Sequence, residues 1–327
     1  MKAAFYERVG PAADVLQVGD LPRPDPAVGE VRVRVQWSGV NPSDVKSRMG
    51  LRSGMPFPRV IPHSDGMGVI DAVGEGVSAH RVGERVWLWN AAWGRPHGTA
   101  CEWVCLASAQ AVPLPDAVSD EAGACLGIPA LTALHSVLMD GGVAGKTVLI
   151  AGGAGAVGHY AVQMASQLGA ARVLTTVSTP EKEALARAAG ADEVIRYKSE
   201  PLVERVKALT AGRGVDRIIE LDMAVNGASN LEMLRESGEC VVYGSSAPAL
   251  QLPFFPLLAK NIQLRFFIVY HLSPADRARA VATLTRMLER GTLQHPIGAR
   301  LPLADIVRAH ERIERGEVTG NLVLQTA

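Results

Sequence analysis

The sequence predicts an α/β protein in two parts, a β-rich first part and a doubly wound parallel sheet after it. The 327 residues are about twice the ~150 that one domain usually takes. Up to about residue 120, short alternating runs such as V-R-V-R-V at 31–35 stand between Gly and Pro, which is typical of half-buried antiparallel strands in a barrel or sandwich. From Thr147 onward, apolar strands alternate with helical segments, which indicates a parallel sheet covered by helices.

The first part contains strands joined by turn-forming residues. The run L-P-R-P-D-P at 21–26 is predicted to be a loop, because its prolines remove backbone donors that a sheet needs. The predicted strands are Val31–Val35, Met67–Val73 and Arg85–Trp89.

The second part begins with an Ala- and Leu-rich segment, 117–138, which is predicted to be helical. The segment 180–189 has Pro near its start and Gly190 after its end, as helix ends favour. The predicted strands are Thr147–Ala151, Arg172–Val177, Glu193–Arg196, Val215–Glu220, Glu239–Tyr243 and Ile262–Tyr270, and the predicted helices are Val157–Leu168, Pro180–Ala189, Leu202–Leu209 and Ser229–Ser237.

The tail, residues 273–327, is expected to form amphipathic helices and to end in a strand, N-L-V-L-Q, that returns to the first part. The apolar strand 262–270 has a second interpretation. A long apolar edge strand left bare invites pairing with other chains, so this run is a candidate interface for a homodimer.

Charge and composition exclude several classes of protein. The chain has 33 Lys and Arg against 33 Asp and Glu, so it lacks the global positive charge that favours nucleic acids or anionic membranes. Hydrophobic residues make up 48% and charged residues 20%, as in ordinary globular proteins. The four cysteines form no metal-binding or disulfide pattern, so we expect buried thiols. With no apolar run of the ~18 residues that a spanning helix needs and no secretory signal, we expect a cytoplasmic protein.

The most informative string is V-L-I-A-G-G-A-G-A-V-G at 148–158. Its glycines Gly153, Gly155 and Gly158 match G-x-G-x-x-G, directly after a predicted strand and at the start of a predicted helix. In that context glycines let the backbone approach a pyrophosphate held at the helix N-terminus. The sequence therefore predicts a dinucleotide site that includes Ala154, Ala156 and Val157.

The end of the second strand indicates which dinucleotide binds. An NAD site commonly has Asp or Glu there to bind the ribose hydroxyls. Here Ser178 and Thr179 follow the strand, and Lys182 lies one helical turn later. No carboxylate stands at that point to repel a 2′-phosphate, so the sequence favours NADPH over NADH. Glu181 is a complication, although an acid in the first turn also serves the helix dipole.

Strings along nearly the whole chain resemble the medium-chain dehydrogenase/reductase superfamily, and within it the zinc-free quinone oxidoreductase branch that includes zeta-crystallin. They are G-V-N-P-S-D at 39–44, H-S-D-G-M-G-V-I at 63–70, G-E-R-V at 83–86, G-I-P-A-L-T-A at 127–133, V-Y-G-S at 242–245 and T-G-N-L-V-L at 319–324. The resemblance implies a GroES-like β-barrel catalytic domain over 1–120, a Rossmann NADPH-binding domain over 121–268, and a return segment over 269–327 that completes the first.

The resemblance also allows a check for zinc. The ligands of the zinc alcohol dehydrogenases would fall at Asn41, Ser64 and Ile128, and none of these can replace the Cys and His that the tetrahedral site needs. We therefore expect no metal, and we expect His63, beside one lost ligand, to be a packed or surface residue. Without a Lewis acid, alcohol oxidation is disfavoured, whereas a quinone or activated alkene accepts hydride directly.

The family pattern places Asn41, Lys46 and Thr132 at the reacting end. Asn41 is expected to hydrogen-bond the acceptor or nicotinamide region, and Thr132 to contact the nicotinamide. Family members frequently have Tyr where this chain has Lys46. Our hypothesis is that Lys46 stabilises the oxygen of the reduced acceptor; the alternative is a solvated lysine at the lip of the cleft.

The same pattern implies the remaining cofactor contacts. Ser178, Thr179, Lys182 and Tyr197 are expected near the 2′-phosphate and adenine. The other ribose and nicotinamide contacts are expected from Asn226, Tyr243, Gly244, Ser245, Ser246, Phe266, Phe267 and Ile268.

Three functions are compatible with these features. The first is an NADPH-dependent quinone oxidoreductase acting by metal-free transfer of hydride or electrons. The second is an NADPH-dependent enoyl or alkenal reductase that reduces a C=C bond. The third is a non-catalytic NADPH-binding protein with a structural or RNA-associated role, although zero net charge and the lack of an aromatic and basic platform weigh against RNA.

Overall fold

A computed structural model describes residues 1–51 and 54–326 of the chain. It contains two compact units, one formed by Met1–Pro129 together with the chain from Thr285 onward, and the other by Ala130–Leu284. The domain boundaries expected from the sequence, at residues 120 and 268, stay a prediction beside this division by contacts.

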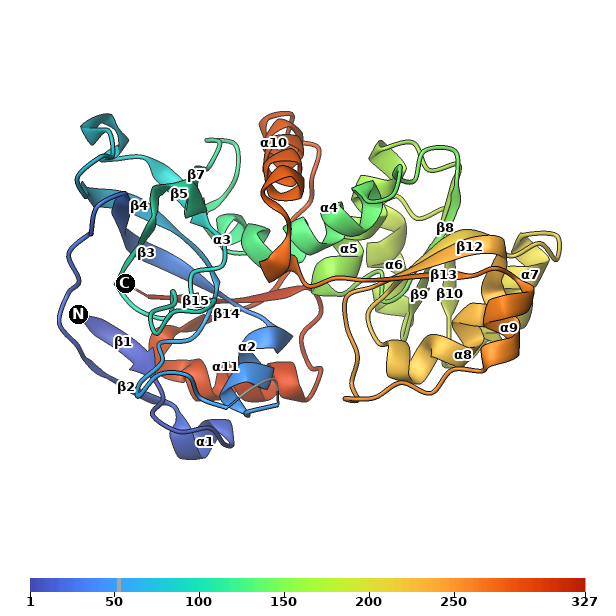
Figure 1. Ribbon diagram of the computed structural model, residues 1–327, viewed down its shortest axis with the longest axis horizontal. Coiled ribbons are helices and arrows are strands. Elements are labelled where there is room, and N and C mark those ends of the chain that lie inside the picture. Colours follow the sequence, from blue (N-terminus) through green and yellow to red (C-terminus); the bar gives the residue numbers. More distant parts are fainter. Residues whose placement is uncertain (52–53, 327) are drawn as a thin grey trace. The chain divides into compact units, whose positions relative to one another are not determined.

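The first unit is built on a seven-stranded sheet and a separate two-stranded one (Figure 1). The larger sheet has the order β14-β15-β3-β4-β5-β7, with β6 also paired to β3. Its pairs are antiparallel except β14 with β15, which run parallel. The strands are β1 (Lys2–Phe5), β2 (Gln17–Asp20), β3 (Glu30–Val40), β4 (Asp65–Val73), β5 (Arg85–Leu88), β6 (Trp103–Ala107), β7 (Ala111–Pro113), β14 (Ile297–Pro302) and β15 (Asn321–Gln325).

The predicted return strand is confirmed, because β15 pairs with β3 and places Leu324 opposite Ser38. Val31, Val33 and Val35 of β3 are fully buried in one core with Leu322 and Leu324, as the period-two pattern predicts. The helices and helical turns of this unit are α1 (Ala12–Val15), α2 (Pro42–Arg48), η1 (Ala79–Arg81), η2 (Ser108–Gln110), α3 (Asp120–Gly123), η5 (Leu303–Asp305) and α11 (Ile306–Glu314).

The second unit is a doubly wound parallel sheet with helices on both faces (Figure 1). Its six strands have the order β10-β9-β8-β11-β12-β13, and all of its pairs are parallel. The order reverses between β8 and β11, and open α/β sheets bind ligands in the crevice at that point. The strands are β8 (Thr147–Ile150), β9 (Arg172–Val177), β10 (Glu193–Arg196), β11 (Val215–Glu220), β12 (Leu234–Val242) and β13 (Gln263–Phe266).

Helices α5 and α6 contact β8, β9 and β10, while α7 and α8 contact β10, β11 and β12. Leu149, Leu174, Ile195 and Ile218 form part of the buried core of this unit. The helices and helical turns from residue 126 to 289 are η3 (Leu126–Ala130), α4 (Leu131–Leu138), α5 (Ala156–Gln167), α6 (Pro180–Ala188), α7 (Leu202–Leu209), α8 (Met223–Met233), α9 (Phe254–Ala259), η4 (Val269–His271) and α10 (Pro274–Glu289).

The structure corrects the helix predicted over 117–138. This segment contains the short helix α3, the π-helical turn η3 and then α4. Pro129 lies inside η3 and has no N–H to continue a regular α-helical ladder. A Cβ at Gly127 would overlap the backbone of Leu88, so the close approach of this turn to β5 requires glycine at this position.

The helix predicted over 229–237 was also wrong, since α8 spans Met223–Met233 and β12 already begins at Leu234. The pattern missed the first turns because Asn226 and Gly227 are poor helix formers. Asn226 instead donates a hydrogen bond to Glu220, so a tertiary contact holds a turn that local propensity does not favour.

The strand predicted over 262–270 is shorter than expected. Only Gln263–Phe266 pair with β12, and Val269–His271 form a 3₁₀ turn. The partner strand ends at Val242, so beyond Phe266 the chain has no strand to follow. Among the residues that the structure describes, no helix is both long enough and apolar enough to span a membrane.

Candidate functional site

The glycine loop joins β8 to α5, as the sequence predicts. Gly155 is the N-cap of α5, so the N–H groups of Ala156 and Val157 lie in the first turn, where no intrahelical acceptor exists. A Cβ at Gly158 would overlap the carbonyl of Gly152, and a Cβ at Gly153 would overlap Thr175. The loop therefore presents helix N–H groups and backbone where an anion can approach.

The sequence pattern missed one glycine of this loop. Gly152 has a φ of +71°, which L side chains rarely adopt, and its N–H donates to the hydroxyl of Thr176 over 3.1 Å. It makes the tight turn that leaves β8, although it lies outside G-x-G-x-x-G. The first glycine of a G-G pair after a strand is the signal that could have indicated it.

The end of β9 carries hydroxyl groups and no carboxylate. Ser178 and Thr179 are half-buried, and Thr179 caps α6 by accepting a hydrogen bond from the backbone N–H of Lys182. Glu181 is exposed, and a hydrogen bond from Thr179 lowers the pKa of its carboxyl. Glu181 lies in the first turn of α6, at the positive end of the helix dipole. It is four residues beyond Val177, where β9 ends.

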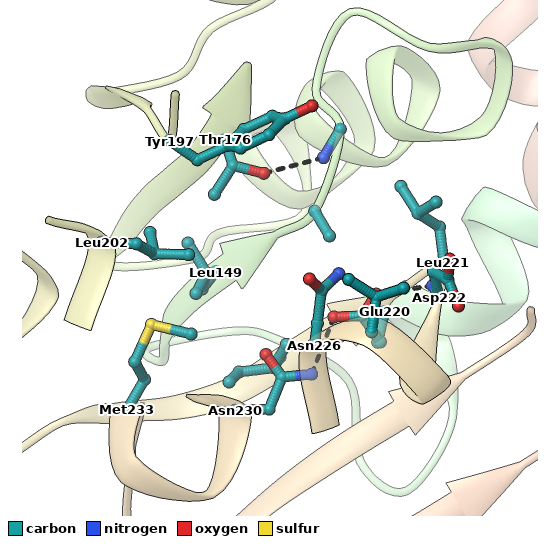
Figure 2. A pocket seen from close by; sticks show the side chains of 14 residues that line it. Leu149, Thr176, Tyr197, Leu202, Glu220, Leu221, Asp222, Asn226, Asn230 and Met233 are labelled. Atoms are coloured by element: carbon teal, nitrogen blue, oxygen red, sulfur yellow. Dashed lines mark hydrogen bonds between the residues drawn. The ribbon is translucent and has the colours of Figure 1, made fainter. Parts of the chain in front are cut away.

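A pocket of about 260 Å³ opens at the crevice between β8 and β11 (Figure 2). Two residues predicted for the cofactor, Tyr197 and Asn226, line it. Tyr197 follows β10 and is 49% exposed, so its ring is accessible as a flat wall. The full lining is Leu149, Ala151, Gly152, Thr176, Tyr197, Leu202, Ile218, Glu220, Leu221, Asp222, Val225, Asn226, Asn230 and Met233.

Glu220 is the buried polar centre of this pocket, and the sequence did not single it out. It ends β11 and is 1% exposed. One carboxylate oxygen accepts from the N–H of Asp222 at 2.6 Å and from the amide of Asn226 at 2.9 Å, and the other accepts from the amide of Asn230 at 2.7 Å. An acid that ends a strand at the switch point, followed by Asn six and ten residues later, is the signal that could have found this group.

The residues predicted after β12 lie beside the same crevice. A Cβ at Gly244 would overlap the carbonyl of Leu221, so the two chain segments touch here. Ser246 donates from its N–H and from its hydroxyl to one oxygen of Asp222, at 2.8 and 3.0 Å. Ser245 bonds within its own loop, to Ala247.

The predicted aromatic residues have different environments. Tyr243 is half-buried, and burial raises the pKa of its hydroxyl. Phe267 lies edge-on to His135 of α4 at 4.7 Å between ring centroids, and Ile268 is half-buried. Phe266 is 55% exposed, so the structure places it on the open edge of β13 and not in an enclosed wall. Thr132, on α4, is 4% exposed, and its carbonyl accepts a hydrogen bond from Ser136.

In the first unit, Asn41 is the N-cap of α2 and is 4% exposed. Its backbone N–H donates to Asp44, and its side-chain amide donates to one oxygen of Asp65 over 2.8 Å. Asp65 is fully buried, and burial, more than the opposing Asn41 hydrogen bond, raises the pKa of its carboxyl well above the usual range. Lys46 is half-buried on α2, five residues after Asn41.

The positions of the lost zinc ligands are occupied by groups of other chemistry. Ser64 and Ile128 are buried, and neither supplies the thiolate or imidazole that such a centre needs. Across the described residues, no group of three or more His, Cys, Asp and Glu could hold a metal ion. The four cysteines are free and buried, as expected.

His63 is fully buried and has partners. Its Nδ1 lies 2.8 Å from the hydroxyl of Ser38, and its Nε2 lies 2.9 Å from Nε2 of His310 on α11. Its φ is +76°, an uncommon conformation for a residue with a side chain. Burial lowers the pKa of His63 to about 3 and that of His310 well below its usual value. Of the two expectations, a packed or a surface residue, the structure shows the packed one, and the packing ties α11 to β3.

Comparison with known proteins agrees with this architecture. The family described as alcohol dehydrogenase GroES-like domain matches residues 27–116, and the family described as zinc-binding dehydrogenase matches residues 156–286. The quinone oxidoreductase of Homo sapiens is 30% identical over 322 residues, which cover 98% of this chain and 95% of that protein.

Two solved structures extend the comparison. The Escherichia coli quinone oxidoreductase complexed with NADPH has a TM-score of 0.88 at 27% identity, and the match covers 99% of this chain and 100% of that one. A NAD-dependent alcohol dehydrogenase has a TM-score of 0.91 at 29% identity, with both chains covered completely.

A GroES-like domain joined to a parallel-sheet Rossmann domain defines an oxidoreductase of the medium-chain dehydrogenase/reductase superfamily. Within that superfamily, the chain belongs to the quinone oxidoreductase family.

Proposed function

We propose that this protein transfers hydride from NADPH to a small quinone without a metal ion. The observation that carries the proposal is the end of β9, where Ser178 and Thr179 stand in place of an acid and Lys182 lies in the first turn of α6. Hydroxyl and ammonium groups suit a 2′-phosphate, whereas a carboxylate there would favour the free ribose hydroxyls of NAD.

The residues around the crevice fit a dinucleotide. The first turn of α5, from Ala156, offers N–H groups and a helix dipole to a pyrophosphate. Tyr197 donates from its backbone N–H to Val177 at the end of β9, and it offers an accessible ring to the adenosine part. When bound, NADPH would supply a hydride equivalent from its nicotinamide ring. The E. coli relative was solved with NADPH and supports this choice, while the NAD-dependent relative makes a direct test necessary.

For the acceptor, we propose that Asn41, Lys46 and Thr132 take part in the reaction. The amide of Asn41 is oriented by Asp65 and keeps a second N–H, which can stabilise negative charge on a carbonyl oxygen. Lys46 would stabilise the same oxygen or donate a proton to it. A hydride and one proton, which together carry two electrons and two hydrogen nuclei, would convert the quinone into its hydroquinone, in which both carbonyls have become hydroxyl groups.

Cofactor choice is tested by steady-state oxidation of NADPH and of NADH with a small quinone. We expect kcat/KM to be higher for NADPH. The change Lys182→Gln should raise the KM for NADPH about tenfold, because a charged hydrogen bond to phosphate contributes about 1.5–3 kcal/mol, and should leave the KM for NADH nearly unchanged. Lys207→Gln, which removes an exposed lysine on α7 paired with Glu232, is the matched control. Equal use of NADH by the wild type would contradict the proposal.

Acceptor choice is tested with quinones, enones and enoyl thioesters under the same conditions. A quinone is expected to give the highest kcat/KM. If an enone or enoyl thioester exceeds every quinone, the C=C reductase replaces the quinone reductase. Tight NADPH binding without turnover of any acceptor would support the non-catalytic alternative instead. For Lys46→Met we expect a lower kcat with quinone and a changed pH profile; unchanged turnover across pH would exclude Lys46.

We also propose that the protein forms a homodimer through the segment 262–270 and acts in the cytoplasm. Strand β13 lies at the edge of the six-stranded sheet, and Phe254, Phe255 and Leu258 of the neighbouring helix α9 are 74%, 72% and 64% exposed. Exposed apolar side chains beside an open strand edge favour self-association. Light scattering should give twice the monomer mass, and Phe266→Lys, at an exposed position of β13, should give a monomer.

A further inference from the structure

The pocket at the end of β11 contains two side-chain amides whose orientation is fixed by one carboxylate. Asn226 and Asn230 lie one helical turn apart on α8, and both donate to Glu220, at 2.9 and 2.7 Å. Carboxylate oxygens accept hydrogen bonds, so the group that each amide turns toward Glu220 is its NH₂. The backbone N–H of Asp222 adds a third donor at 2.6 Å and holds the carboxylate in place.

Fixing the nitrogens also fixes the oxygens. In Figure 2, both asparagines project from α8 toward the cavity, with their nitrogens on the side of Glu220 and their oxygens on the other side. An asparagine alone can turn its amide to suit either a donor or an acceptor. Bound to Glu220, this pair presents carbonyl oxygens, which are acceptors, to whatever occupies the pocket.

The rest of the lining matches a flat, mostly apolar group. Tyr197 and Thr176 lie on one side of the cavity and the two asparagines on the other (Figure 2). Leu149, Leu202 and Met233 supply apolar surface. Among the described residues that line the pocket there is no lysine and no arginine. The pocket of about 260 Å³ lies just below the range for drug-sized ligands, as suits a single heterocycle.

We propose that Glu220, Asn226 and Asn230 together select the nucleobase of the dinucleotide, accepting adenine with its exocyclic amino group and rejecting hypoxanthine, which has a carbonyl at that position. This inference rests on the proposed function, because the base belongs to the proposed cofactor. Asn226 and Asn230 act on the base, and Glu220 is a positioning residue that acts through them. The carbonyl of hypoxanthine has no hydrogen atom to donate to the two fixed amide oxygens, whereas the amino group of adenine has two.

The test uses ligands that contain the base and the 2′-phosphate and lack the nicotinamide. Titration calorimetry of the full chain gives the Kd of adenosine 2′,5′-bisphosphate and of inosine 2′,5′-bisphosphate. We expect the wild type to bind the adenosine compound at least tenfold more tightly, since an unpaired buried acceptor costs that much or more. In Glu220→Gln the side chain can donate as well as accept, so the asparagines can turn and the ratio should fall toward one.

A second variant and a control separate base selection from general damage. Asn226→Ala leaves Glu220 in place and removes one oxygen, and should lower the ratio even if Glu220→Gln does not fold. Glu232→Gln makes the same charge change on the same helix, but Glu232 is exposed, lies outside the pocket lining and pairs with Lys207; its ratio should stay at the wild-type value. A lowered ratio in Glu232→Gln alone would overturn the assignment to the asparagines.

The outcomes also distinguish this inference from the proposed function. Equal Kd values for the two compounds in the wild type would overturn base selection and leave NADPH binding intact. Failure of the wild type to bind either compound would overturn both. An unchanged ratio in folded Glu220→Gln, confirmed by thermal melting, would show that Glu220 does not position the amides.

Discussion

The two units bury their polar side chains in different ways. In the second unit, both oxygens of Glu220 are bound by N–H donors, two of them asparagine amides on the next helix. In the first unit, Asp65 accepts from Asn41 through one oxygen, while its other oxygen, and Nδ1 of His310, lack a hydrogen bond of normal geometry in the part of the chain that the structure describes.

The contrast shows what each cluster can do. A carboxylate with three donors is rigid, and it transmits that rigidity to the amides that bind it. Burial disfavours charge. It raises the pKa of Asp65 against the hydrogen bonds of Asn41 and of the Ile128 backbone, and it lowers the pKa of both histidines of the buried pair, so all three groups favour their neutral forms. The Glu220 cluster of the second unit therefore holds its side chains in one orientation, as ligand recognition needs. The stability of the first unit depends instead on the protonation of Asp65, His63 and His310.

The largest expected effect comes from removing the carboxylate of Glu220, which accepts three hydrogen bonds. In Glu220→Ala, three N–H donors lose their acceptor in a buried site, and we expect the free energy of unfolding to fall by about 3–5 kcal/mol. Urea denaturation at pH 7.5 measures it. Thr179→Ala, which removes only the cap of α6, should cost about 1 kcal/mol and serves as the comparison. A loss below 1 kcal/mol for Glu220→Ala would mean that Glu220 is not the centre of the cluster.

The histidine pair of the first unit should make stability depend on pH in the acid direction. Burial lowers the pKa of His63 to about 3 and that of His310 further below the ordinary 6.5, so the unfolded chain binds protons there that the folded chain does not. Stability is fully present above pH 6.5 and falls as the pH drops toward 3. Each histidine contributes about 1.4 kcal/mol per pH unit in this range.

The change His310→Phe removes one of the two histidines. Between pH 6 and 4.5 it should therefore reduce the slope of the unfolding free energy against pH by about 1.4 kcal/mol per pH unit. Urea denaturation at several pH values gives the slope. His80→Asn, at an exposed position in η1, should leave the slope as in the wild type. If both variants keep the wild-type slope, the pair does not stay neutral in the folded state.

The two carboxylates can be compared through matched amide substitutions. Glu220→Gln places an NH₂ group among three donors, so we expect a loss of about 2 kcal/mol. Asp65→Asn can still accept from Asn41 through its oxygen, and its NH₂ replaces an oxygen without a well-formed bond, so the loss should stay below about 1 kcal/mol. Equal losses in urea denaturation would show that the two sites do not differ as the structure indicates.

The sequence predicted most of the fold because its strands carry clear local signals. The glycine loop, the strands β9, β10 and β11 and the helix α7 lie where the residue pattern places them. The predictions failed where a distant contact determines the conformation, as for the start of α8, which the bond from Asn226 to Glu220 holds. Local propensity contains no information about such a partner.

The candidate site was predicted unevenly for the same reason. Backbone motifs identified the loop at Gly153–Gly158, because its chemistry depends on glycine and on a strand-to-helix turn. Glu220, Asp222 and Asn230 were missed, since each is an ordinary polar residue until the fold gathers them around one pocket. For His63 the sequence left a packed and a surface position open, because its partner His310 lies 247 residues away in the sequence.

The smallest expected effect is the pH dependence of stability that Asp65 causes. Its direction is opposite to that of the histidine pair, so it tests the contrast between Asp65 and Glu220 directly. Burial raises the pKa of Asp65 well above 3.8, with the charge of Asp44 acting in the same direction and the Asn41 hydrogen bond against it. The folded chain therefore holds a proton that the unfolded chain releases. This contribution to stability is fully present below pH 3.8 and is lost as the pH rises through the folded-state pKa.

Asp65→Asn removes that titration and keeps the shape of the side chain. The wild type should therefore be more stable relative to Asp65→Asn at pH 4.5 than at pH 8, a direction opposite to that of the histidine pair. Both proteins contain His63 and His310, so the histidine contribution cancels in the difference between them. Paired urea denaturation curves at the two pH values measure this difference. If the wild type instead gains stability relative to Asp65→Asn toward pH 8, Asp65 is stabilised as an anion, like a carboxylate with a full set of donors. The contrast with Glu220 would then disappear.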